Sequence, residues 1–396
     1  MSVNARLLGL MSREMRILLL TGGGESNDAQ LRDLLAGPVQ WDGLRTLLEW
    51  ERTLPVSWER LKRLGVDASQ DGADQIERLS RVSGFTALML EDRLRRLIAG
   101  LESEGIPAIL LKGAGLALSA YPRFADRPMG DLDVLIAPEH SKRAWELALS
   151  QGWVWDEHEY PSSHYQAHHH LPPLFDAART GVRLELHTAL SLSSHPFSLS
   201  FEQARAVSRP ISERSELTRV LDPEHQLLHL AVHFAWGHLA SFGIWRLARD
   251  VAALAERGID WQRVLELSRG YKAEFAMYWS LRLADLLCGV SVAPVGVLAS
   301  LAPRRSAWML QLLERHLAIH VIAIITPCPS AKLRRAMWSM ALEPNRTATS
   351  RERPWDSEPA RRPTVYAGDA GVVTRIKTQL TRGRAWRRYF NVLWAT

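Results

Sequence analysis

Residues 109–137 read ILLKGAGLALSAYPRFADRPMGDLDVLIA, and this stretch decides the fold that the sequence predicts. The nearly continuous apolar run that ends at Gly113 is typical of a buried strand, and the small residues after it predict a short helix that ends at Pro122. The segment DLDVLIA predicts a second strand, and the segment that follows it predicts a helix that begins with proline. Further on, HHLPPLFDA and GVRLELHTAL predict two more strands. Residues 105–190 therefore predict a small domain that contains both strands and helices.

The segments on both sides of this domain predict helices, because their apolar residues recur at spacings of three and four. We therefore expect an α+β fold in which a small mixed-sheet domain is flanked by helical N-terminal and C-terminal regions. The expected units are a helical N-terminal region at 1–104, the sheet domain at 105–205, a helical C-terminal domain at 206–342 and a basic linker and tail at 343–396.

Composition and charge exclude several classes of protein. The chain has 396 residues, of which 46% are hydrophobic and 23% charged, which excludes an intrinsically disordered protein. Residues 351–396 carry ten Lys/Arg and four Asp/Glu, and this surplus equals the whole net charge of +6. A basic fold that could bind nucleic acid over its whole surface is therefore not expected, whereas a basic tail is.

The compartment is predicted from cysteine usage and hydropathy. Only two cysteines occur, Cys288 and Cys328, which favours a reducing compartment. The longest apolar run, 317–326, is about half of the ~20 residues that a membrane-spanning helix needs. We expect a soluble, cytoplasmic protein with no integral membrane segment.

Three carboxylates predict a metal site. Asp131 and Asp133 are two residues apart on a predicted strand, so their side chains point to the same face. Two adjacent carboxylates repel each other unless a cation neutralises them, and Mg²⁺ prefers such oxygen ligands together with phosphate oxygens. Glu185 lies among apolar residues on another predicted strand. If the two strands are neighbours, Glu185 completes a site able to hold two Mg²⁺ ions, which would support in-line attack at phosphorus.

The turn at Lys112 and Gly113 is the predicted phosphate site. Glycine permits close approach of the backbone to a phosphate, the helix N-terminus favours negative charge, and Lys112 adds a cation. Arg123 and Arg127 are further candidates to hold a triphosphate. A second glycine-rich segment, LLLTGGGES at 18–26, lacks the Gly-Lys-Ser/Thr ending of a phosphate loop and predicts an ordinary turn.

Together these motifs resemble the uncharacterised nucleotidyltransferase family of the polymerase-beta-like superfamily. The likeness is carried by Leu-Lys-Gly, then a Tyr and an Arg, then Asp-x-Asp on a strand, and later RLELHTAL. It extends loosely from the N-terminal helices to about residue 300. It implies a nucleotidyltransferase fold, Mg²⁺, and transfer of a nucleoside monophosphate from an NTP to a hydroxyl with loss of pyrophosphate.

The resemblance also implies roles for individual residues. Asp131, Asp133 and Glu185 would bind the metal, Gly113 would be the phosphate-loop glycine, and Glu185 could act as base. Ala114 stands where the superfamily commonly has a hydroxyl residue. The apolar, histidine-containing C-terminal region favours a small molecule or a peptide as acceptor, with a protein hydroxyl or a tRNA end as alternatives.

Histidines offer competing interpretations. His187 should share the face of Glu185 and line the cleft, either to position the acceptor or as a packed, hydrogen-bonded side chain. A zinc site is an alternative for the cluster at 164–170. His229 and His233 are four residues apart on one predicted helix, which would suit a metal-dependent hydrolase, although core or cleft-wall histidines explain the pattern better.

Other readings of the chain stay open. A non-catalytic module that binds a nucleotide or a partner could use the same scaffold. Arg246 and Asp250, also four apart, predict an ion pair. The basic C-terminal tail could bind an anionic lipid, RNA or an acidic partner, or pack on its own chain.

Overall fold

The computed structural model describes most of the chain. The described residues are 11–69, 72–166, 168–177, 181–191, 195–212, 215–321, 328, 330–342, 383, 385–387, 389–390 and 393. Residues 343–382 of the predicted basic linker and tail lie outside them.

Helices form the N-terminal region, as the spacing of its apolar residues predicts. They are α2 (Arg13–Thr21), α3 (Asp28–Leu35), α4 (Trp41–Trp50), α5 (Leu54–Arg63) and the long α6 (Ala73–Ser103). Leu44, Leu48 and Leu61 are fully buried in a core that also contains Leu283 and Leu317 of the C-terminal helices. The two helical regions therefore share one hydrophobic core, although the sheet separates them in the sequence.

One seven-stranded mixed sheet forms the centre of the fold, with the order β3-β4-β5-β2-β1-β7-β6. The strands are β1 (Ala108–Leu110), β2 (Asp131–Ile136), β3 (Trp153–Trp155), β4 (Leu174–Asp176), β5 (Arg183–His187), β6 (Ser208–Ser212) and β7 (Ser215–Leu221). β2 is antiparallel to β1 and parallel to β5, and β1 is parallel to β7. The sheet thus extends past residue 205, where the sequence predicted the end of the catalytic core, to residue 221.

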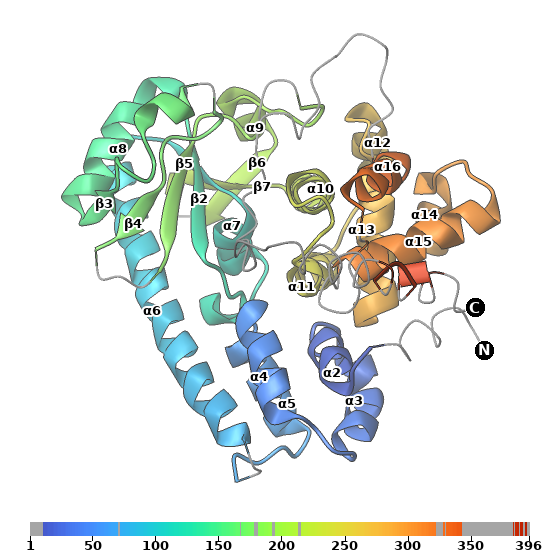
Figure 1. Cartoon of the computed structure of the whole chain (residues 1–396). Coiled ribbons are helices and arrows are strands. Elements are labelled where there is room, and N and C mark those ends of the chain that lie inside the picture. The colour runs from blue at the N-terminus through green and yellow to red at the C-terminus, as the bar shows by residue number, and fades with distance from the viewer. Residues whose placement is uncertain are drawn as a thin grey trace, which may run out of the picture.

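The two faces of the sheet have different neighbours. Leu132 and Val134 of β2 and Leu184 of β5 belong to a second core that also includes Leu94 and Leu97 of α6. Because side chains alternate along a strand, Asp131 and Asp133 point to the opposite face. That face is turned toward α7 (Lys112–Ser119) and α10 (Pro223–Val232), which Figure 1 shows between the sheet and the other C-terminal helices.

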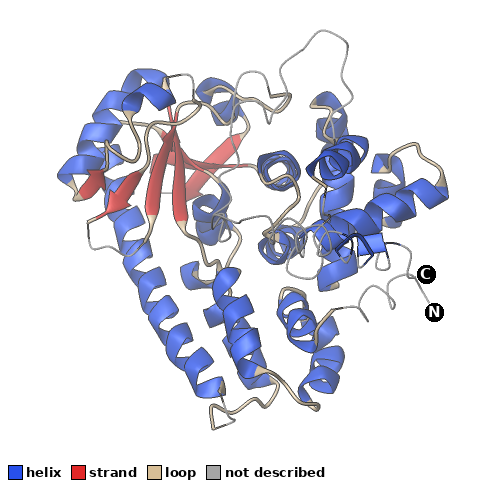
Figure 2. Ribbon diagram, viewed as in Figure 1, coloured by secondary structure: helices blue, strands red, loops and turns tan. Residues whose placement is uncertain are grey.

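The remaining helices are mostly C-terminal. They are α8 (Ser141–Ser150), α9 (Phe201–Ala206), a π-helical turn (His233–Gly237), α11 (Ile244–Glu256), α12 (Trp261–Gly270), α13 (Glu274–Cys288), α14 (Val295–Leu301), α15 (Ala307–Val321) and α16 (Ala331–Leu342). In Figure 2 the strands gather on one side of the molecule and these helices mainly on the other. The α+β class with flanking helical regions is therefore confirmed. Among the described residues, no helix is both long enough and apolar enough to cross a membrane.

A buried ion pair joins the loop before β2 to α11. Arg127 donates from Nε and Nη2 to the two carboxylate oxygens of Asp250, at 2.7 and 2.8 Å. The Tyr121 hydroxyl donates to the same carboxylate at 2.6 Å. The predicted pairing of Asp250 with Arg246 is wrong, because the Arg246 guanidinium donates instead to the backbone oxygen of Glu51. Residues four apart on a helix can be in contact, but here Arg127 from another element reaches Asp250 with two donors.

Candidate active site

Asp133 lies at the centre of the candidate site. Its Oδ1 accepts hydrogen bonds from Lys112 Nζ at 2.7 Å and from His187 Nε2 at 2.8 Å. The parallel pairing of β2 with β5 places Asp133 beside Glu185. The condition set by the sequence, that the strands of Asp133 and Glu185 be neighbours, is therefore met. Since two donors occupy Oδ1 and no described residue donates to Oδ2, the second oxygen is left to bind a cation or a substrate.

The backbone at the end of β1 positions Lys112. Its φ of +43° lies in the left-handed region, which costs a residue with a side chain about 1–3 kcal/mol and is typical of functional sites. The helix α7 that starts here lies tightly on β1, because a Cβ on Gly115 would come 2.6 Å from the Leu110 carbonyl oxygen. A glycine at 115 therefore lets the N-terminus of α7 approach the acidic strand.

The charges in the site stabilise an ionised pair. Burial would lower the pKa of Lys112, but the carboxylates of Asp133, Glu185 and Asp131 raise it above its usual value. Burial opposes ionisation of Asp133, yet Lys112 and the His187 hydrogen bond hold its pKa well below the usual range. Lys112 is thus a cation and Asp133 an anion at neutral pH.

The pKa values of Glu185 and His187 are shifted in opposite directions. Burial and the neighbouring charge of Asp133 raise the pKa of Glu185 to about 7. Burial lowers the pKa of His187, so its ring is neutral. Because the ionised Asp133 can only accept, the ring proton lies on Nε2, and the buried Nδ1 has no partner among the described residues. Glu185 can therefore take up or release a proton near neutral pH, whereas His187 orients Asp133.

The donor set suits a divalent metal. Asp133, Glu185 and His187 each offer one ligand atom, and these atoms lie within 4.8 Å of one another. Asp131, two residues before Asp133 on the same face, is connected to Glu185 through Arg183, whose Nη2 lies 3.7 Å from both carboxylates. Carboxylate oxygens fit a hard ion such as Mg²⁺, and one imidazole would also be accepted by Mn²⁺.

The two predicted phosphate-binding arginines lie in different environments. Arg127 is buried, and its Nη1 donates to the Pro128 carbonyl oxygen at 2.6 Å while lying 3.4 Å from the place of a Cβ on Gly113. Arg123 is exposed and paired with Asp126 at 2.6 Å. Arg127 is thus beside the phosphate turn although Asp250 engages it, and Arg123 lies at the surface. A contact of either with phosphate stays a prediction.

Histidines line the site on the side of α10. The positive charge of Lys112 acts on His229, His233 and His238, and burial with this charge lowers the pKa of His229 and His238 to about 3 each. The rings of His169 and His170 both lie 5.3 Å from that of His187. In the described part of the chain, the only histidine in a group of convergent metal ligands is His187. The geometry favours cleft-wall histidines over the hydrolase and zinc interpretations.

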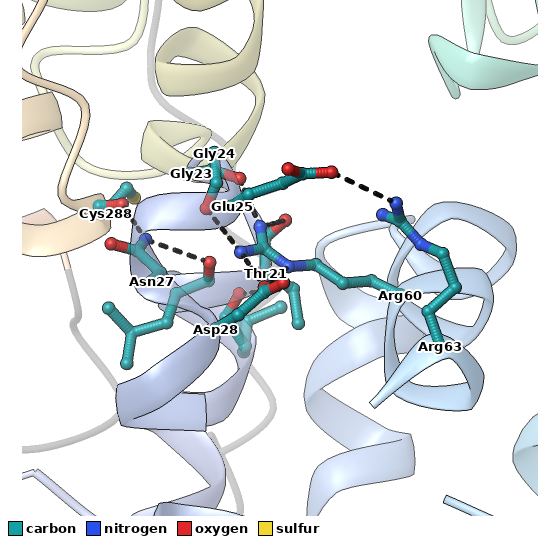
Figure 3. Close-up of polar contacts among 11 residues, drawn as sticks. Thr21, Gly23, Gly24, Glu25, Asn27, Asp28, Arg60, Arg63 and Cys288 are labelled. Carbon is teal, nitrogen blue, oxygen red and sulfur yellow. Dashed lines mark hydrogen bonds and ion pairs between the residues drawn. The ribbon is translucent and has the colours of Figure 1, made fainter. Parts of the chain in front are cut away.

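The other glycine-rich segment is a structural turn (Figure 3). Arg60 donates to the backbone oxygens of Gly23 and Gly24 and to Asp28. Asn27 donates to the backbone oxygens of Leu20 and of Cys288 at the end of α13. A phosphate loop offers N–H groups, whereas this turn directs carbonyl oxygens at a cation. It therefore ties the N-terminal helices to α13.

Sequence reasoning missed several residues close to the acidic cluster. Arg183 could have been found, because it is two residues before Glu185 on one strand. Nothing in the sequence placed Arg52 or Arg246 near the carboxylates, since they come from helical regions about 80 and 115 residues away from Asp131 in the sequence.

The mixed sheet, the paired acidic strands and the Lys-Gly turn are consistent with the nucleotidyltransferase class that the motifs predicted. A family model described as uncharacterised nucleotidyltransferase matches residues 37–289. This is more than half of the chain, and the protein belongs to this family. No curated protein and no solved structure matches the chain significantly.

The buried histidines predict a loss of stability in acid. Burial lowers the pKa of His195 to about 4 and that of His316 to about 3. The unfolded chain binds these protons near pH 6.5, so stability is fully present above that pH and is lost between there and the folded-state values. Each such histidine should contribute a slope of up to about 1.4 kcal/mol per pH unit. We expect the free energy of unfolding in urea to fall from pH 7 to pH 5.

Two variants test this cause. His195→Gln should reduce the slope by about one proton, whereas His158→Gln, at an exposed position, should leave it unchanged. An unfolding free energy that is constant between pH 7 and pH 5 would contradict the expectation.

Proposed function

We propose that this protein transfers a nucleoside monophosphate from an NTP to a hydroxyl of an acceptor, with release of pyrophosphate. The observation that carries the proposal is the pairing of Asp133 with Glu185 on adjacent strands, beside Lys112 at the end of a third. Family membership supports the reaction class.

The acidic residues would bind the metal cofactor. In the proposal Asp131, Asp133 and Glu185 hold two Mg²⁺ ions, which when bound supply positive charge to the reacting phosphate and to the attacking oxygen. Lys112 and His187 fix the orientation of the Asp133 carboxylate through its Oδ1. This leaves Oδ2 directed to the cofactor, and mutual repulsion of the acids is partly compensated before the cofactor binds.

Glu185 is the proposed base. The acceptor oxygen forms a bond to the α-phosphorus, and the bond from that phosphorus to the oxygen bridging to the β-phosphate breaks. Pyrophosphate leaves, and the proton of the acceptor hydroxyl passes to the Glu185 carboxylate. Before the cofactor binds, burial and the charge of Asp133 raise the pKa of Glu185 to about 7. Bound cations would lower this pKa and favour the carboxylate form that accepts the proton.

The turn before α7 would hold the triphosphate. Gly113 permits close approach of phosphate oxygens to the N-terminus of α7, and Lys112 contributes a positive charge. Arg127 lies next to Gly113 and Arg123 nearer the surface, and both are kept as phosphate contacts in the proposal. ATP is the first nucleotide to test.

The acceptor side and the surroundings are proposed from weaker features. His229, His233 and apolar residues of α10 would line the acceptor side and favour a small molecule or a peptide, with a protein hydroxyl or a tRNA end as alternatives.

Two free, buried cysteines support a cytoplasmic location. In the tail, the Tyr389 hydroxyl is hydrogen-bonded to His316 at 2.7 Å, so this residue packs on α15. An anionic partner for the basic tail is kept in the proposal.

The direct test uses NTPs labelled at the α- or the γ-phosphate, with Mg²⁺ and a small-molecule cell extract as acceptor pool. We expect transfer of the α-label only, release of pyrophosphate, and no transfer by the Asp131→Ala/Asp133→Ala variant. Asp92→Ala, which removes an exposed aspartate paired with Arg96 on α6, is the matched control and should stay active.

Two other results would replace the proposal. Transfer of the γ-label would indicate a kinase-like reaction. Absence of transfer and of Mg²⁺-dependent NTP binding would favour the non-catalytic module that binds a partner on the same scaffold.

A further inference from the structure

Two arginines from outside the sheet converge on the start of β2. The guanidinium of Arg52, in the turn between α4 and α5, packs against Gly130, because a Cβ on that glycine would overlap Arg52 Nη1. Gly130 directly precedes Asp131. Arg246, in the first turn of α11, is close enough that the charges of Asp131, Arg127 and Arg52 all act on its pKa. Arg52 and Arg246 therefore form a cationic rim beside the start of β2.

Arg246 is incompletely paired. Its Nη1 donates to the Glu51 backbone oxygen at 3.0 Å, and its other N–H groups have no acceptor among the described residues. The nearby Glu51 carboxylate raises the pKa of Arg246, while burial raises the pKa of Glu51 itself. Burial lowers the pKa of Arg246, and the Glu51 carboxylate opposes this only in part.

Three other cations near the acidic strands already have acidic partners. Lys112 is paired with Asp133, and Arg127 with Asp250. Arg183 lies between Asp131 and Glu185. The charge left over at the rim belongs to Arg52 and Arg246, which come from two helical regions that meet there through the bond between Arg246 and Glu51. A ligand that suits this rim carries several negative charges and reaches Asp131.

We propose that Arg246 and Arg52 bind the β- and γ-phosphates of the nucleotide, an inference that rests on the proposed function and names further residues of its substrate site. A guanidinium matches phosphate oxygens with paired N–H donors. The terminal phosphates would thereby lie at the start of β2, with the α-phosphate nearer Asp133. Binding would also connect α4, α11 and the sheet through one ligand.

Calorimetric titration with inorganic tripolyphosphate and with a non-hydrolysable ATP analogue, both with Mg²⁺, tests the assignment. We expect Arg246→Gln and Arg52→Gln each to weaken binding of both ligands about tenfold, in line with the loss of one charge-assisted hydrogen bond. Gly130→Ala should act like Arg52→Gln, because the added methyl group displaces the guanidinium. Arg95→Gln, which changes an exposed arginine paired with Glu91 on α6, is the control and should bind both ligands like the wild type. Arg246→Lys, which keeps the charge, should recover part of the affinity and guards against misfolding, as does the midpoint of thermal unfolding.

The outcomes separate this inference from the function. Equal tripolyphosphate affinity of the wild type, Arg246→Gln and Arg52→Gln would overturn the inference, even if the wild type transfers the α-label. Arginine-dependent binding without any transfer would uphold the inference and overturn the proposed reaction. No binding of either ligand to the wild-type protein would overturn both.

Discussion

Asp133→Asn is expected to reduce kcat/KM for α-label transfer by on the order of 10³-fold. Loss of several kcal/mol of charge stabilisation at phosphorus corresponds to this factor. Asparagine has the same shape and can still accept from Lys112 and His187, so the fold should be kept. The change removes the negative charge that would bind the cofactor, and Mn²⁺ binding measured by electron paramagnetic resonance should weaken in parallel.

The matched control is Asp92→Asn, which changes an exposed aspartate that is paired with Arg96 on α6. This variant should retain transfer within about twofold and bind Mn²⁺ like the wild type, since surface ion pairs contribute little. If Asp133→Asn kept a rate within about tenfold of the wild type, while both variants unfolded normally, Asp133 would not be part of the reacting centre.

Arg127→Met should be the most destabilising single change outside the hydrophobic core. It leaves the buried Asp250 carboxylate with only the Tyr121 hydroxyl, and removal of one partner of a buried pair costs about 3–5 kcal/mol. The free energy of unfolding, measured in urea at pH 7, should fall by this amount. The loop before β2 would then lose its attachment to α11.

A double-mutant cycle identifies the cause. Arg127→Met/Asp250→Leu should be more stable than either single variant, because no unpaired charge stays buried. Arg123→Met, whose partner Asp126 accepts at the surface, should cost no more than about 1 kcal/mol. Additive losses in the double variant would show that packing, and not the ion pair, holds the loop.

Local patterns predicted the central strands because their signals are short-range. The apolar run before Lys112 and the alternation in DLDVLIA correspond to β1 and β2, and the Leu-Glu-Leu-His segment to β5. The same alternation predicted that Asp131 and Asp133 share a face and that Glu185 shares one with His187. The sequence alone left open whether β2 pairs with β5, since the register between strands depends on the whole sheet.

Contacts between segments that are far apart in the sequence were not predicted, for a physical reason. Asp250 lies one helical turn from Arg246, so sequence spacing suggested that pair, yet Arg127 arrives from another element with two aligned donors. Likewise, Arg52 reaches Gly130 only because α4 and α5 pack beside the sheet. Such choices depend on tertiary geometry, which no local pattern contains.

The sequence by itself determined the secondary structure around the site, the three carboxylates and the family of the protein. Only the tertiary structure decided how these groups are charged and oriented. Burial raises the pKa of Glu185, Lys112 and His187 meet on one oxygen of Asp133, and the helical regions bring Arg52 and Arg246 to the start of β2. Residue type and spacing fix which groups can ionise or bind, but desolvation and long-range contacts fix the state they adopt.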